Sequence, residues 1–120
     1  MDNVVKSFLS FKIQIKLYHW RTISYARHKA TDEFLISFDD RVDKFVEAMI
    51  GSRDVKPIDK FRMDLVSLTE KTIIDYINSF KQFLIFELPS LLFEHEMDLF
   101  NLRDEILSDL NKMLYLFRLK

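Results

Sequence analysis

Apolar side chains recur at intervals of three and four residues in four stretches of the chain, a spacing typical of amphipathic helices. The first stretch predicts a helix that begins at Asp2 or Asn3, both suitable N-cap residues, and runs to about Trp20 or Thr22. Its apolar positions are Val4, Val5, Phe8, Leu9, Phe11, Ile15 and Tyr18. We expect this stripe to pack against a neighbouring helix, because the apolar face of a helix is normally covered in a folded protein.

The second stretch predicts a helix from Tyr25 to about Ile50, with Ser24 as its N-cap. Its apolar stripe comprises Phe34, Phe38, Val42, Phe45 and either Ala48 or Met49. Gly51 suits a left-handed C-terminal stop, since glycine adopts a positive φ without steric strain. The residues from Gly51 to Pro57 are the clearest predicted loop.

The third and fourth stretches predict two further helices. Ser67 and Glu70 match a capping box, so we expect the third helix to begin there and to run to about Phe86. Its core candidates are Ile73, Ile74, Ile77, Phe80 and Leu84. The last helix is strongly periodic and begins near Ser90 or near Met97. Its apolar stripe comprises Leu99, Leu102, Ile106, Leu110, Met113 or Leu114, and Phe117.

Composition favours an all-helical fold. One glycine and two prolines occur in 120 residues, so turn-forming residues are scarce, while 48% of the chain is apolar. No stretch alternates credibly between apolar and polar residues over the length of a strand. The length suits one domain with a core of its own. We therefore predict an all-α fold, a four-helix up-down bundle with short links, in a single domain of residues 1–120.

Charge and cysteine content narrow the functional classes. The formal net charge is −1 and no long block of like charges occurs, which argues against nucleic-acid binding through a basic surface. No run of about 18 apolar residues is present, so we expect no membrane span and no membrane partner. Cysteine is absent, which excludes disulfides and thiol chemistry. A cytoplasmic setting is the expectation that follows.

Five potential metal ligands fall in the first half of the chain: His19, His28, Asp32, Asp43 and Glu47. The three carboxylates would share one face of the second helix, because their offsets of 11 and 4 residues return to similar angles at about 100° per residue. The rise of about 1.5 Å per residue, however, separates Asp32 from Asp43 by roughly 16 Å along the axis. One ion, with ligand bonds of about 2 Å, cannot reach both within one chain, so a shared site requires a second, antiparallel copy of the helix.

The chemistry of these ligands indicates which ions they suit. Imidazole and carboxylate together favour iron, manganese or zinc over calcium, which prefers oxygen, and copper(I), which prefers sulfur. In a shared site, the two histidines and Asp32 of one chain would meet the last two carboxylates of the other. The intrachain di-iron pattern Glu-x-x-His is absent. The residues three positions before the three histidines are Lys16, Tyr25 and Leu92.

Each candidate ligand also has an ordinary structural interpretation. Single Asp and Glu residues on a helix are usually solvated surface, and His19 beside Trp20 suits a hydrogen-bonded packing role. His28 lies in the first turn of the predicted second helix, where the helix dipole disfavours a cation and so favours the neutral, metal-ligating imidazole. A metal-free helical-bundle protein with a structural or interaction role is therefore the alternative to a metal site.

Three short segments carry a family resemblance: Leu17-Tyr18-His19-Trp20, His28-x-x-x-Asp32 and Asp43-x-x-x-Glu47. Together they resemble the ferroxidase segment of the Dps-type miniferritins (DNA-binding proteins from starved cells), which belong to the ferritin-like superfamily. In that family a His-Trp pair ends the first helix and a second His begins the next. An Asp follows four residues later, and an Asp and a Glu come further along the same helix, at the spacing seen here. The resemblance covers roughly residues 15 to 50.

The resemblance implies a ferritin-like bundle that binds iron (Fe2+ and Fe3+) and acts as a ferroxidase, with peroxide or dioxygen as the oxidant. Manganese and zinc are the other candidate ions. It also implies a homo-oligomer, at least a twofold dimer, with the site between two subunits. His19 and His28 would be neutral nitrogen ligands, and Asp32 would orient a ligand or bridge toward a second ion. Asp43 and Glu47 would be the carboxylate ligands from the partner.

The chain also departs from the usual pattern of these miniferritins. The link between His19 and His28 is about three residues shorter than is usual, and the region from Gly51 to Val66 is too brief for their extra mid-chain helix. The basic tail that many members use for DNA is missing, so DNA binding is not expected. Trp20 would lie beside the site and could intercept an oxidising radical. The chain also resembles small Dps-like proteins found in viruses.

Overall fold

The computed structural model describes residues 1–119, and all regular elements in that range are helical. The four main helices are α1 (Asp2–Arg21), α2 (Tyr25–Arg53), α3 (Thr72–Gln82) and α4 (Met97–Phe117). A π-helical turn, η1 (Phe83–Glu87), and a 3-10 turn, η2 (Leu88–Leu91), follow α3. The predicted all-α structure with four main helices is therefore confirmed. None of the helices within residues 1–119 combines the length and the hydrophobicity that a membrane span needs.

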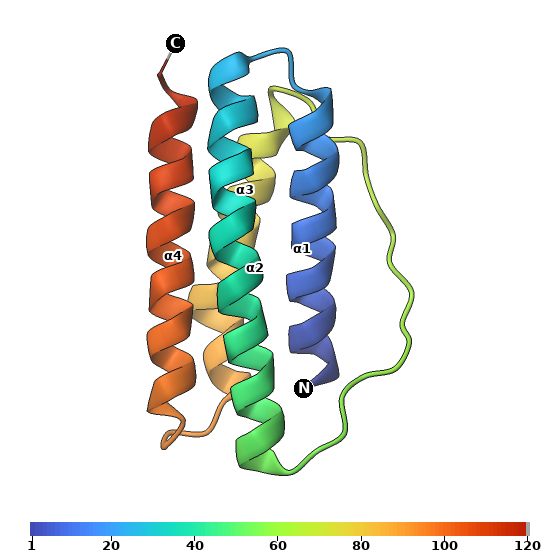
Figure 1. Cartoon of the computed structure of the whole chain (residues 1–120), viewed down its shortest axis with the longest axis vertical. Coiled ribbons are helices and arrows are strands. Elements are labelled where there is room, and N and C mark those ends of the chain that lie inside the picture. Colours follow the sequence, from blue (N-terminus) through green and yellow to red (C-terminus); the bar gives the residue numbers. More distant parts are fainter. Residues whose placement is uncertain (120) are drawn as a thin grey trace.

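The helices lie side by side, with α1 antiparallel to α2 and α3 antiparallel to α4 (Figure 1). Residues 54–71 form a long connection that leaves the end of α2 and returns along the outer side of α1 to the opposite end of the molecule. As a result, α2 and α3 run in the same direction, and the expected up-down order with short links is wrong at this connection. The return is feasible because an extended chain spans about 3.3 Å per residue, roughly twice the rise of a helix.

The two ends of α2 differ in how well the sequence predicts them. Ser24 is the N-cap, as predicted, and its side-chain oxygen accepts a hydrogen bond from the backbone N–H of Arg27 at 3.2 Å. The predicted stop at Gly51 is wrong, because the helix continues to Arg53 and the left-handed residue is Asp54, with φ 51°. Aspartate is one of the few residues besides glycine that adopt this conformation, because its short polar side chain can hydrogen-bond locally.

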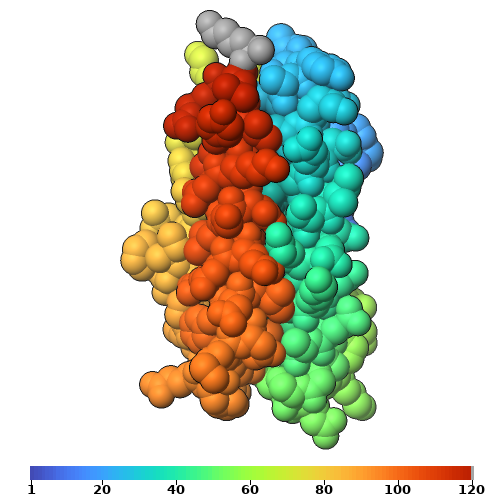
Figure 2. Space-filling model, turned by 60° about the vertical axis from the view of Figure 1, so that its left-hand side comes forward, coloured from blue at the N-terminus to red at the C-terminus, as the bar shows by residue number. Residues whose placement is uncertain are grey.

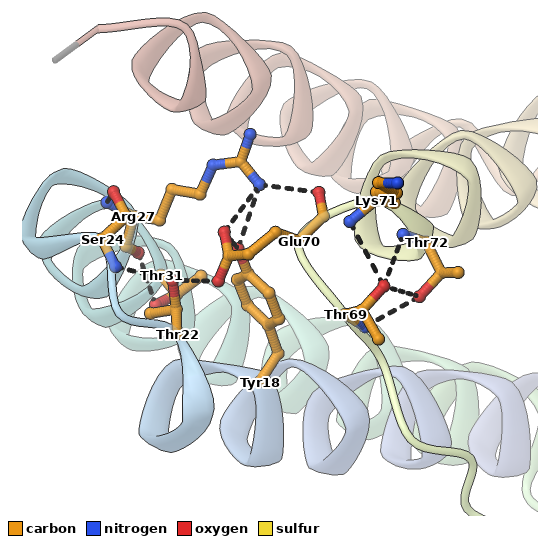
Figure 3. A network of polar contacts seen from close by, with 9 residues as sticks. All are labelled: Tyr18, Thr22, Ser24, Arg27, Thr31, Thr69, Glu70, Lys71 and Thr72. Atoms are coloured by element: carbon orange, nitrogen blue, oxygen red, sulfur yellow. Dashed lines mark hydrogen bonds and ion pairs between the residues drawn. The ribbon is translucent and has the colours of Figure 1, made fainter.

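The N-terminus of α3 is capped two residues later than predicted. The hydroxyl of Thr69 accepts a hydrogen bond from the N–H of Thr72 at 3.2 Å, and the hydroxyl of Thr72 accepts one from the N–H of Thr69 at 2.8 Å. The predicted capping box of Ser67 and Glu70 is wrong, because the Glu70 side chain is engaged elsewhere (Figure 3). Its carboxylate accepts hydrogen bonds from the hydroxyl of Tyr18 in α1, from that of Thr22 just after α1, and from the guanidinium of Arg27 in α2.

The segment between α3 and α4 departs from regular α-helix. The α-helical part of α3 ends at Gln82, before the predicted end at Phe86, because the π-helical turn follows directly. Arg103 of α4 donates a hydrogen bond at 3.0 Å to the carbonyl oxygen of Leu84 within this turn. Helix α4 begins at Met97, which is the later of the two predicted starts.

The core is rich in aromatic side chains and draws on all four helices. Phe11 of α1 and Phe80 of α3 stack with ring centroids 3.9 Å apart, and the ring of Phe38 from α2 meets Phe11 edge-on at 5.6 Å. The predicted stripe of α2 is buried, with Met49 rather than Ala48 as its last member. Helix α4 packs along α2 over most of its length (Figure 2). It buries Leu99, Ile106, Leu110, Met113 and Phe117.

The long connection is fastened to α1 near its end. The buried amide of Gln14 pairs with the backbone of Val66: its Nε2 donates to the carbonyl oxygen at 2.9 Å, and its Oε1 accepts from the N–H at 2.6 Å. Arg21 donates a hydrogen bond to the hydroxyl of Ser67, and Leu68 is buried. Residues 55–69 form no helix, which agrees with the expectation that this region is too brief for an additional one.

Candidate metal centre

His19 and His28 lie on either side of the short turn between α1 and α2. His19 belongs to the last turn of α1, and His28 to the first turns of α2. Their imidazole rings stack, with centroids 4.0 Å apart and planes inclined by 15°. The Nδ1 of His28 donates a hydrogen bond at 3.0 Å to the backbone carbonyl oxygen of His19, so the neutral ring carries its lone pair on Nε2.

The buried hydroxyl of Thr31 fixes the tautomer of His19. Its single proton is donated to backbone carbonyl oxygens one turn earlier, those of Arg27 at 2.8 Å and His28 at 3.1 Å. Toward His19 the hydroxyl therefore accepts, and the Nδ1 of His19 carries the proton in their 2.8 Å hydrogen bond. Both rings thus leave Nε2 free while a second group orients Nδ1, an arrangement common among metal-ligating histidines.

His19 is held in the neutral form near pH 7. Burial lowers the pKa of its imidazole below the ordinary value of 6.5, and the proximity of His28 and of the Lys16 ammonium lowers it further. The carboxylate of Asp32, which follows His28 by one helical turn, acts on the same pKa in the opposite direction. Neutral imidazole is the form that binds metal ions.

Asp32 also borders a groove between α1 and α2. The groove is lined by Lys12, Ile13, Lys16, Asp32, Leu35, Ile36 and Asp39. Its apolar side chains reach solvent, with Ile36 exposed by 70% and Ile13 by 37%. Two of the residues that line the groove lie one helical turn from the histidines, because Asp32 follows His28 by four residues and Lys16 precedes His19 by three.

The last two candidate ligands, Asp43 and Glu47, are exposed further along α2. Because α2 is unbroken, the rise per residue places Asp43 roughly 16 Å from Asp32 along the axis. Within residues 1–119, no three His, Asp or Glu side chains come together in a way that could hold an ion. The structure therefore brings His19 and His28 together, places Asp32 one helical turn after His28, and leaves the other two carboxylates apart in the same chain.

Other carboxylates on this face are paired within the chain. Asp39 forms an ion pair with Lys12 of α1, and Asp40 forms one with Lys44 in the next turn of α2. Among residues 1–119, no salt bridge involves the three carboxylates that the sequence nominates as ligands, Asp32, Asp43 and Glu47.

Sequence reasoning did not identify Thr31 and Lys16 as part of this surface. A threonine hydroxyl that bonds back to a carbonyl one turn earlier is frequent in helices, so Thr31 carries no local signal of its contact with His19. The ammonium of Lys16 lies 5.3 Å from the ring centroid of Trp20, one turn later in α1. Helical spacing could have suggested this second contact, because residues four apart share a face.

The fold and this site define a small all-helical protein with a histidine pair and, on one face of α2, three carboxylates that form no salt bridge within residues 1–119. A family model described as Family of unknown function (DUF5856) matches residues 19–117, and the chain therefore belongs to this family. The matched span begins at His19 and contains all five candidate ligands. Comparison with curated proteins gives no match, and comparison with solved structures also gives none.

Proposed function

We propose that the chain is a Dps-like protein of the ferritin-like type that binds Fe(II) between two subunits and oxidises it to Fe(III). Iron is the substrate of this site. The observation that carries the proposal is the pair of His19 and His28, each with Nδ1 engaged and Nε2 free, with Asp32 one helical turn after His28. The resemblance of the surrounding segments to the ferroxidase segment of Dps-type miniferritins supports the same function.

The topology supports the ferritin-like part of this proposal. Ferritin-like folds are four-helix bundles with one long crossover connection. Residues 54–71 make such a connection here, so that α2 and α3 run parallel (Figure 1). The connection follows the outer side of α1 and does not pass in front of α1 and α2. Asp43, Glu47 and Ile36 are exposed on α2, so this part of the helix is accessible to a second copy of the chain.

Two copies of α2 can meet in one antiparallel register that brings the ligands together. The ligands and their neighbours form two series with intervals of four residues, namely His28, Asp32, Ile36 and Asp39, Asp43, Glu47. The register that sets Asp32 level with Asp43 of the second copy also aligns the remaining members pair by pair. Twofold symmetry repeats the arrangement, so each dimer has two equivalent sites. The exposed Ile36 then lies near the symmetry axis.

The ligand set accounts for the proposed chemistry. Neutral imidazole nitrogens and carboxylate oxygens together suit Fe(II), and the carboxylates stabilise the higher charge of Fe(III). Oxidation removes one electron from each Fe(II), and one molecule of peroxide takes up two electrons and two protons to give two molecules of water. His19 and His28 bind as neutral ligands, and Thr31 keeps the first ring in its orientation. Trp20, 66% exposed and next to His19, can donate an electron to a stray radical.

The test of this function is the rate of Fe(II) oxidation with peroxide or dioxygen. Wild-type protein is expected to retain iron and to oxidise it faster than buffer does. His19→Ala and Asp43→Ala are each expected to abolish the effect, because a mixed site that loses one ligand leaves the other carboxylates in mutual repulsion. Asp98→Ala, an exposed carboxylate in the first turn of α4, is the matched control and should behave as wild type.

Mixing two inactive variants tests whether the site is shared. One variant lacks both histidines, His19 and His28, and the other lacks Asp43 and Glu47. A mixed dimer has one complete site, so partial activity should return once subunits exchange. If exchange is demonstrated and activity stays absent, the ligands are not shared between chains. If wild-type protein neither retains iron nor speeds its oxidation, the metal-free structural role replaces this proposal.

A further inference from the structure

We infer that iron binding and dimerisation are obligately coupled: the iron-free chain is a monomer, and the first Fe(II) assembles a dimer whose second site is already complete. The inference rests on the proposed function, because it takes the shared site as given. It adds a mode of regulation, since the affinity of the protein for iron would depend on the concentration of the protein itself.

The first argument is the division of the ligands within one chain. No three candidate side chains converge within residues 1–119, and the two ligand groups lie roughly 16 Å apart along α2. A monomer therefore offers only the histidine pair, with Asp32 one turn further along α2 in a groove that also carries the positive charge of Lys16. Such an incomplete site binds a divalent ion weakly, because affinity depends on the number and geometry of the ligands.

The second argument is the charge distribution on α2. Asp39 and Asp40 are neutralised by lysines of the same chain, whereas Asp32, Asp43 and Glu47 have no salt bridge in the described residues. The dimer register sets Asp32 level with Asp43 of the second copy, and it does so twice. Without a cation these like charges oppose association, and Lys16, which lines the groove, offsets only part of them. A bound Fe(II) lies between the carboxylates of the two copies and attracts both, so the repulsion is replaced by attraction.

The third argument is symmetry. A single association event completes both sites. The free-energy cost of bringing two chains together therefore weakens binding of the first ion and does not affect binding of the second. Binding is then positively cooperative, by the reciprocity that links two ligands acting on one equilibrium. When two chains and two ions react together, the midpoint Fe(II) concentration falls with the square root of the protein concentration. A hundredfold rise in protein should therefore lower the midpoint by about tenfold.

The coupling can be measured without catalysis, using Fe(II) alone under anaerobic conditions. Trp20 is the single tryptophan and lies beside His19, so its fluorescence reports on the site. Titrations at two protein concentrations a hundredfold apart should give the tenfold shift in midpoint and a Hill coefficient above one. Sedimentation velocity on the same samples should show monomer without iron and dimer with it. A midpoint that does not depend on protein concentration, or an iron-free dimer throughout the range, would overturn the inference.

A charge-neutralised variant tests the electrostatic argument separately. Asp32→Asn combined with Asp43→Asn removes the opposed carboxylates, so this variant should dimerise without iron at lower concentration than wild type while losing Fe(II) binding. Asp98→Asn should behave as wild type in both assays. A neutralised variant that stays as monomeric as the iron-free wild type would refute the argument from repulsion. If wild-type protein binds no Fe(II) at any concentration, the proposed function fails and the coupling fails with it. If Fe(II) binds with a midpoint that does not depend on protein concentration, the coupling is refuted and the proposed function is not.

Discussion

The hydroxyl of Thr31 in α2 accepts a hydrogen bond at 2.8 Å from Nδ1 of His19 in α1, and so joins the two helices at the candidate metal centre. Both side chains are buried, with Thr31 fully covered and His19 exposed by only 5%. The contact determines which nitrogen of the ring is free and how the ring is oriented. Groups that orient a ligand also control metal affinity, so a substitution of Thr31 should change Fe(II) affinity even though Thr31 is not itself a ligand.

Replacing Thr31 with valine should weaken Fe(II) binding while leaving every ligand in place. Valine has nearly the same shape but cannot accept a hydrogen bond, so the Nδ1–H of His19 loses its partner. Loss of an orienting group typically lowers metal affinity by about 10–100-fold. Thr31→Ser keeps the hydroxyl and is the matched control, for which calorimetric titration with Fe(II) should give affinity close to wild type. Equal affinities for the valine and serine variants would show that the hydroxyl does not position the ring.

Ile36 provides a test of the dimer face that touches no ligand. Its side chain is 70% exposed beside the α1–α2 groove, near the proposed twofold axis. Ile36→Glu should prevent dimerisation in the presence of Fe(II), because it adds a buried negative charge next to the carboxylates of both copies. Ile23→Glu, at a position 96% exposed in the α1–α2 turn, is the control. With Fe(II) present, sedimentation equilibrium should show monomer for the first variant and dimer for the second. The opposite result would mean that the dimer interface does not include Ile36.

The sequence predicts the helices well because their signals are local. Periodic apolar positions and the cap at Ser24 act within a few residues, and both are found as expected. The stop at Gly51 fails because glycine permits a left-handed turn without requiring one, and Asp54 adopts it instead. The capping box at Ser67 fails for a tertiary reason. Glu70 bonds to residues more than 40 positions away in the chain, which no local pattern records.

The candidate site likewise has features that the local sequence predicts and features that depend on the tertiary structure. The spacing of Asp32, Asp43 and Glu47 on one helix follows from helix geometry, and α2 is continuous as that argument requires. The stacking of His19 on His28 depends on how the turn between α1 and α2 folds, which lies beyond periodicity. The route of residues 54–71 was not predicted, because we assumed that short links join consecutive helices. This connection instead returns along the whole length of the bundle.

The buried Glu96 forms an ion pair with the partly buried Arg53 at the end of the bundle opposite the histidines, and breaking this pair should destabilise the fold. Glu96 is 3% exposed and accepts hydrogen bonds from Arg53 Nε at 2.9 Å and Nη2 at 2.6 Å. Glu96→Gln leaves the partly exposed guanidinium without its countercharge, so the free energy of unfolding should fall by about 1.5–3 kcal/mol. Urea denaturation at pH 7 measures this loss. Glu94→Gln, an exposed neighbour, should change stability little.

The same ion pair predicts a dependence of stability on pH. The hydrogen bonds from Arg53 lower the pKa of Glu96 in the folded state below its ordinary value of 4.5. The unfolded chain therefore takes up a proton on this carboxylate at higher pH than the folded chain does. The stabilisation is fully present above pH 4.5 and is lost as the pH falls through the folded pKa. Glu96→Gln should show a shallower loss of stability than wild type in this acid range, and identical slopes would contradict the assignment.

Gln14 is predicted to control how tightly the long connection is held. Its buried amide makes two hydrogen bonds to the backbone of Val66, and Gln14→Met removes both while keeping a side chain of similar length. Losing them should weaken attachment of the connection by about 1–2 kcal/mol, which raises the population of the detached form by about tenfold. Lys60 and Arg62 are exposed trypsin sites within this connection, so cleavage there should accelerate by a similar factor while the helical circular-dichroism signal is unchanged. Gln82→Met, at an exposed position at the end of α3, should leave the cleavage rate as in wild type. Equal cleavage rates for all three proteins would mean that the connection is held by the burial of its own apolar side chains and not by the amide of Gln14.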